Sequence, residues 1–131
     1  MKHLSEKSFV ILRSIVERIN NGYLKLDSKS GYIPLVAENI GDYTFEKILY
    51  QKISLAHYGE SNGDLMADPE MIFLFSNESR LAIPFYYKND WIGIEQYSLV
   101  LEENKYLPKL QANQTEFAEM WMKNIAEQQK L

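Results

Sequence analysis

Cysteine is absent from this chain of 131 residues. Its absence excludes disulfides, thiolate metal ligands and cysteine nucleophiles. No apolar run approaches the roughly 18 residues that a membrane-spanning helix requires. The first apolar stretch, residues 9–12, is cut short by Arg13 and Glu17, which argues against a secretory signal. We therefore expect a cytoplasmic protein with no membrane partner.

Basic residues are missing from one long segment. No lysine or arginine lies between Lys52 and Arg80. The acidic residues in this gap are Glu60, Asp64, Asp68, Glu70 and Glu78. The rest of the chain holds thirteen acidic and fourteen basic residues, so the net charge of −4 arises in this segment. Because nucleic-acid binding depends on clustered positive charge, which this chain lacks, we expect no direct nucleic-acid partner.

The length and the 46% hydrophobic content are ordinary for one globular domain, so residues 1–131 are expected to form a single α+β domain. Apolar residues at steps of three and four predict a helix from Ser5 to Asn20, with Ser5 as its N-cap and Asn21-Gly22 as its stop. Alternating residues at 23–26 and an apolar run at 33–40, on either side of a turn at residues 27–31, predict a β-hairpin.

More strands are expected at residues 45–58, 71–75, 81–87 and 91–101, with a helix as the alternative for the first half of residues 45–58. The short connectors, residues 76–79 and 88–90, predict antiparallel hairpins.

The end of the chain has a helical pattern. Asn113 with Glu116 three residues later resembles a capping box and predicts a helix from Thr115 to Gln128. The residues expected to face the sheet are Phe117, Trp121 and Ile125. The predicted architecture is an antiparallel sheet of about five or six strands with an N-terminal helix and a C-terminal helix packed on it.

The segment from His57 to Phe75 is the best candidate for a site, because it places acidic and turn-forming residues between two apolar runs. We predict an acidic loop from Glu60 to Glu70 that binds another protein together with neighbouring aromatic residues. The candidate surface consists of His57, Glu60, Asp64, Asp68, Glu70, Asp90 and Trp91. On its strand, His57 is more typical of a hydrogen-bonded, half-buried histidine than of a ligand.

Two familiar motifs fail in this segment. Residues 59–63 match the G-x-S-x-G elbow of serine hydrolases, but no histidine follows His57 and Pro69 interrupts the helix that should come next. Residues 60–64 alternate like the first ligands of a calcium loop, but Leu65 stands where glycine is required. We therefore identify no catalytic residue here.

A carboxylate site for magnesium or manganese stays open as the alternative, so a metal-dependent enzyme or metal-binding domain is the second hypothesis. Its ligands would be His57, Asp64, Asp68 and Glu70. No cofactor is expected under the leading hypothesis, and the oligomeric state and partner identity are not predicted.

Several segments resemble an uncharacterised domain family of bacterial plasmids, conjugative elements and phages. The most specific are Ser54-Leu-Ala-His-Tyr58, Asn62-Gly-Asp64 and Asp68-Pro-Glu-Met71. The resemblance runs from about Tyr23 to Gln129 and implies a genomic setting but no activity. With this setting, the localised acidic charge and the lack of a complete catalytic set lead us to expect a small cytoplasmic accessory protein of a mobile genetic element that acts by binding another protein.

Overall fold

The computed structural model describes residues 1–27 and 34–131. In chain order its elements are α1 (Glu6–Val16), β1 (Tyr23–Leu26), β2 (Leu35–Phe45), β3 (Ile48–Ser61), β4 (Asp64–Ser76), β5 (Leu81–Asn89), β6 (Ile94–Tyr97), β7 (Leu99–Val100), β8 (Lys105–Tyr106) and α2 (Pro108–Gln129). Strands β1 to β6 form one antiparallel sheet in sequence order, and β7 pairs with β8 separately. The predicted α+β architecture is confirmed.

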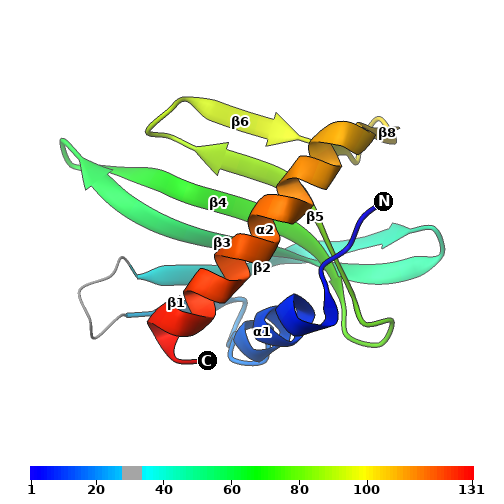
Figure 1. The fold of residues 1–131 in the computed structure, drawn as a ribbon, viewed down its shortest axis with the longest axis horizontal. Coiled ribbons are helices and arrows are strands. Elements are labelled where there is room, and N and C mark those ends of the chain that lie inside the picture. The colour runs from blue at the N-terminus through cyan, green and yellow to red at the C-terminus, as the bar shows by residue number, and fades with distance from the viewer. Residues whose placement is uncertain (28–33) are drawn as a thin grey trace.

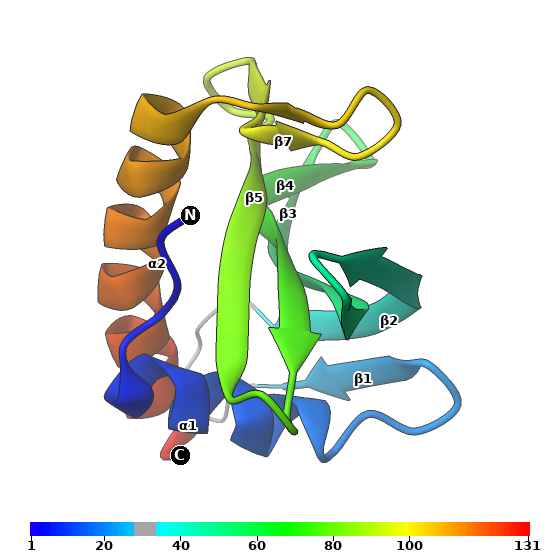
Figure 2. The ribbon, with the colours of Figure 1, turned by 90° about the vertical axis from the view of Figure 1, so that its right-hand side faces the viewer.

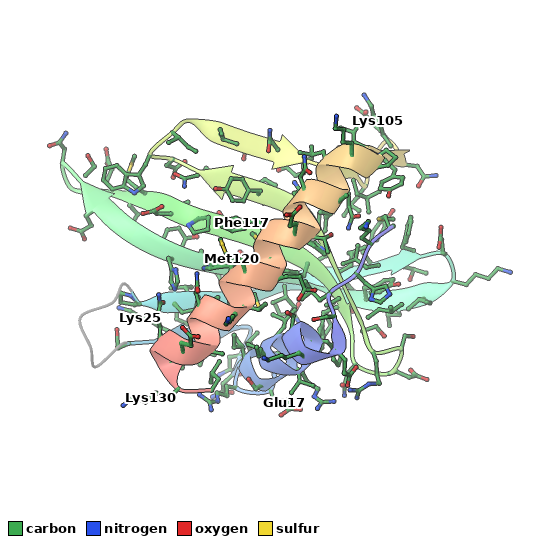
Figure 3. All side chains as sticks on the ribbon, in the orientation of Figure 1. Glu17, Lys25, Lys105, Phe117, Met120 and Lys130 are labelled. Atoms are coloured by element: carbon green, nitrogen blue, oxygen red, sulfur yellow. The ribbon has the colours of Figure 1, made fainter. Side chains whose placement is uncertain are left out.

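Both helices lie on one face of the six-stranded sheet, which we call the helix face. Helix α2 crosses the sheet diagonally, with α1 beside it (Figure 1). The fully buried side chains between these layers include Leu12, Ile15, Leu55, Phe73, Met122 and Ile125. Each such side chain stabilises the fold by about 1.5–3 kcal/mol relative to leaving it exposed. As predicted, Phe117, Trp121 and Ile125 face the sheet, and the Phe117 ring lies 5.2 Å from that of Tyr87. Figure 3 labels Phe117 on α2.

The opposite face of the sheet, which we call the open face, is covered by the described residues only at one end. A second apolar cluster there consists of Tyr50, Leu74, Ile83, Phe85, Tyr86 and Leu99. Leu99 belongs to β7, which lies across the sheet from the two helices (Figure 2). Because β3 contributes to both clusters, each of its faces is partly covered, as expected. The helical alternative for the first half of residues 45–58 is wrong, because β3 is paired with β2 and β4.

The first helix is shorter than predicted. Ser5 is its N-cap and accepts a hydrogen bond from the Ser8 N–H at 3.3 Å, as expected. The helix ends at Val16 and not near Asn20. Asn21 and Gly22, with φ of 54° and 79°, form a later turn and are not the stop of the helix. This turn leads into β1, which pairs with β2 as predicted. Of the loop predicted at residues 27–31, residues 28–31 lie outside the described part of the chain.

The second helix begins at Pro108 rather than at Thr115, so the predicted capping box at Asn113 is wrong. Proline suits the first position of a helix, where no backbone donor is needed. Three polar residues near the start of α2 are buried, namely Gln111, Gln114 and Thr115, and buried polar residues hide the start of a helix from hydrophobic periodicity. Gln111 donates to the carbonyls of Lys2 at 2.7 Å and Pro84 at 3.1 Å, which fixes the first turns of α2 on β5.

The region predicted as one strand, residues 91–101, is divided. Trp91 belongs to the β5–β6 turn, and residues 94–97 and 99–100 form β6 and β7. Ser98, between them, is fully buried and donates a hydrogen bond to the Gln114 side chain at 2.6 Å. This contact joins the junction between β6 and β7 to α2, while the Ser98 N–H still donates to the Phe85 carbonyl of β5 at 2.9 Å.

Candidate functional site

The segment predicted as an acidic loop is a β-hairpin. Strand β3 runs to Ser61 and β4 starts at Asp64, so these two residues face each other across a two-residue turn. Asn62 and Gly63 have φ of 53° and 86°, the left-handed geometry that such turns require and that Asn-Gly adopts readily. The predicted loop at residues 60–70 is therefore wrong, since this turn lets both strands continue to a tip beyond the β5–β6 turn (Figure 1).

The pleat of the hairpin distributes its acidic residues over both faces of the sheet. His57 lies on the helix face, where its ring meets that of Trp121 edge-on with centroids 5.5 Å apart. Ser54 lies on the open face, and its hydroxyl donates a hydrogen bond to Glu70 at 2.9 Å. Glu60 also lines the open face. His57 and Glu70 therefore lie on opposite sides of the sheet.

His57 is a core residue rather than part of a surface. Its side chain is 8% exposed, and its Nε2 has no hydrogen-bond partner among the described residues. Burial lowers the pKa of the imidazole, although the negative charge of Asp68 acts in the opposite direction. The ring is therefore neutral at neutral pH, which suits its contact with Trp121.

Asp90 connects the β5–β6 turn to the hairpin. Its carboxylate accepts a hydrogen bond from the Ala67 N–H at 2.7 Å, and its own N–H donates to the Ala67 carbonyl at 2.9 Å. Lys88 lies 3.5 Å from the other carboxylate oxygen. Beside it, Asp68 accepts a hydrogen bond from Asn89 at 3.3 Å. Asp68 and Asp90 therefore hold strands together, a role that the sequence did not reveal.

The proposed metal ligands do not converge. His57 is buried under α2, Glu70 faces the open side, and Asp64 is exposed at the hairpin tip. Within the described ranges, no group of three or more His, Asp or Glu residues is arranged to hold a metal ion. The geometry therefore gives no support to a metal site built from His57, Asp64, Asp68 and Glu70.

Large apolar side chains are exposed at this end of the sheet. Leu65 follows the hairpin turn and is 67% exposed, and Ile92 in the β5–β6 turn is 63% exposed. Trp91 is half exposed, and its indole passes close to the backbone of Gly59. Glu60 and Asp64 are exposed on the same hairpin. We define the hairpin surface as Glu60, Asp64, Leu65, Trp91 and Ile92.

A groove continues from the hairpin surface across the open face. Its volume is about 500 Å³. Its lining consists of Tyr23, Lys25, Pro34, Val36, Glu38, Tyr58, Glu60 and Leu65. Burial, and after it the charges of Glu70, Glu38 and Asp90, raise the pKa of Tyr58 to about 12. Several carboxylates therefore act on one tyrosine inside the groove.

Sequence reasoning found Glu60, Asp64 and Trp91 of this region and missed its other residues. Leu65 and Ile92 gave a usable signal, because each is an apolar residue next to a tight turn. Glu38 and Tyr58 gave none, since strand pairing brings them together from β2 and β3.

Taken together, fold and site define a small α+β protein with two helices on one face of an antiparallel meander and an acidic, aromatic open face. The chain belongs to the family described as Domain of unknown function (DUF6908), whose model matches residues 7–131. The matched range includes nearly all of α1, which the resemblance noted above did not cover. No match was found among curated proteins or among solved structures. In the part of the chain that the structure describes, neither helix is long and apolar enough to cross a membrane.

Proposed function

We propose that this protein binds another protein through the hairpin surface. The observation that supports the proposal is the exposure of Leu65, Trp91 and Ile92 at the end of the sheet that also carries the exposed carboxylates of Glu60 and Asp64. Apolar side chains rimmed by charge are typical of interaction sites on soluble proteins.

The residues of the hairpin surface have complementary roles in such a contact. Trp91 supplies a large, rigid anchor of the kind that dominates binding energy at interfaces. Glu60 and Asp64 speed association with a positively charged partner and disfavour an acidic one. The preferred partner therefore carries a basic surface around an apolar pocket.

The proposal includes the setting implied by the resemblance, a cytoplasmic accessory protein of a mobile genetic element. A survey of gene neighbourhoods across the family tests this part separately. Most family members should lie beside genes for plasmid replication, conjugative transfer or phage functions. A predominance of family members in stable chromosomal surroundings would contradict it.

The binding role is tested by affinity capture from the cells that encode the protein, with captured proteins quantified by mass spectrometry. Trp91→Ala should weaken capture of the main partner about 30-fold, which corresponds to the roughly 2 kcal/mol of a typical interface anchor. The double variant E60K/D64K should abolish capture.

Matched controls separate the hairpin surface from general effects. Met120→Ala removes a comparably exposed apolar side chain from α2, and E103K/E116K reverses two exposed charges elsewhere. Both controls should capture the partner as the unchanged protein does. Equal losses in controls and hairpin variants, or unchanged capture by all of them, would refute the proposal.

A further inference from the structure

We infer that the groove on the open face binds an extended, arginine-bearing segment of the partner protein. This inference rests on the proposed function, because Glu60 and Leu65 belong to both the groove and the hairpin surface. One partner can therefore occupy both.

The shape of the groove suits a side chain with its adjoining backbone. Its volume of about 500 Å³ falls in the range of specific ligand sites. It spans strands β1 to β4, with Tyr23 on β1, Glu38 on β2 and Tyr58 on β3. Tyr23 and Glu38 are direct cross-strand partners, so an aromatic ring and a carboxylate lie side by side on one wall.

The charge of the groove favours a cation. Glu38 and Glu60 line it, and Glu70 is close enough to act on Tyr58. Among the described residues, no lysine or arginine forms an ion pair with these three glutamates. The lysine in the lining, Lys25, lies 3.8 Å from Asp27. The groove therefore presents carboxylates whose charge is not balanced within the described chain.

The combination of tyrosine rings and carboxylates selects guanidinium among cations. A guanidinium group is planar, forms paired hydrogen bonds with a carboxylate and stacks on aromatic faces. Arginine is also the more frequent partner in cation–π contacts. The two tyrosines and two glutamates that line this groove offer both kinds of contact.

The position of the groove favours a peptide over a free small cation. It begins at β1, the edge strand of the six-stranded sheet. An edge strand offers unpaired backbone groups along which an extended segment can align. From there the groove leads to Leu65 on the hairpin, so a segment lying in it reaches this apolar residue of the hairpin surface.

Isothermal titration calorimetry with the full-length protein and synthetic peptides tests the inference. The probe is an eight-residue peptide with arginine at alternate positions between serine and glycine. A matched peptide carries citrulline, which is neutral, at the same positions, and argininamide serves as the free cation. The arginine peptide should bind saturably and more weakly at higher salt. The citrulline peptide should show no saturable binding.

Variants locate the binding. Glu38→Gln and Glu60→Gln should each weaken the arginine peptide about tenfold, because each removes one charge-assisted contact. Glu103→Gln, an exposed change outside the groove, should leave affinity unchanged. Circular dichroism and thermal melting verify that all three variants fold.

Two results would overturn the inference. If argininamide binds as tightly as the arginine peptide, the groove binds a free cation and not a peptide. If the arginine peptide shows no saturable binding, the groove does not bind an arginine-bearing segment. If partner capture still depends on Trp91 while the peptide does not bind, the groove inference fails and the proposed function stands. If the peptide binds but the hairpin variants capture the partner protein as well as the unchanged protein does, the proposed function fails.

Discussion

At the scale of single residues, His57 shows how a polar side chain can belong to the core. Its imidazole is enclosed between β3 and α2, against Trp121. Burial lowers its pKa more than the neighbouring charge of Asp68 raises it, so the folded protein favours the neutral ring. In the unfolded chain the same ring takes up a proton near its ordinary pKa of about 6.5.

This difference predicts acid sensitivity. The contribution of His57 to stability is fully present above about pH 6.5 and is lost as the pH falls toward the lower pKa of the folded state, by at most about 1.4 kcal/mol per pH unit. Urea unfolding between pH 7.5 and 5.0 measures it. His57→Phe, which keeps an aromatic contact with Trp121, should flatten the slope, whereas His3→Gln should not. An unchanged slope in His57→Phe would show that another group is responsible.

At the scale of elements, the β3–β4 hairpin depends on contacts outside its own two strands. Its tip extends past the end of β5, where Asp90 continues the pairing by bonding to the Ala67 N–H. The carboxylate thereby takes the place of the backbone carbonyl that β5 would supply if it continued past Asn89. It also joins the two parts of the hairpin surface, since Trp91 and Ile92 directly follow Asp90.

Removing this carboxylate should loosen the hairpin locally. In Asp90→Ala the Ala67 N–H loses its acceptor, and amide hydrogen exchange at Ala67 should accelerate about tenfold, as expected for a lost hydrogen bond of about 1–1.5 kcal/mol. Asp90→Asn, which keeps an acceptor oxygen, should show a smaller change, and Asp64→Ala should show none. Exchange at the Ala67 amide that is equally slow in all variants would exclude this role.

The elements differ in how much of them the sequence could predict. Alternating apolar residues identified the meander, and Ser5 marked the start of α1, because both signals are local. The start of α2 was hidden, since buried Gln111 and Gln114 depend on distant backbone partners. The acidic segment carried a hairpin signal in Asn62-Gly63, but its cluster of charges suggested a loop.

The candidate site was predictable only as a region. Local composition placed acidic and aromatic residues near positions 57–75 and 90–91, and that region remains the proposed interaction site. The division of these residues between two faces depends on register and on the β3–β4 irregularity near Tyr58. No local pattern reports such a register, so the sequence grouped His57 with Glu70, which the sheet separates.

At the scale of the whole molecule, the two faces of the sheet differ in how much of each is covered. The helix face is closed by α1 and α2 and contains the main core, whereas β7 and β8 cover only part of the open face (Figure 2). The uncovered part contains the groove and leads to the projecting hairpin. The main core is thus on one side of the sheet, and the proposed peptide groove is on the other.

Photo-cross-linking in the cells that encode the protein tests the central claim most directly. Benzoylphenylalanine placed at position 92, in the hairpin surface, should form a cross-link to the partner protein that disappears in the E60K/D64K background. The same group at position 120, on exposed α2, should form none. Cross-linking from position 120 but not from position 92 would place recognition on the helix side and contradict the account.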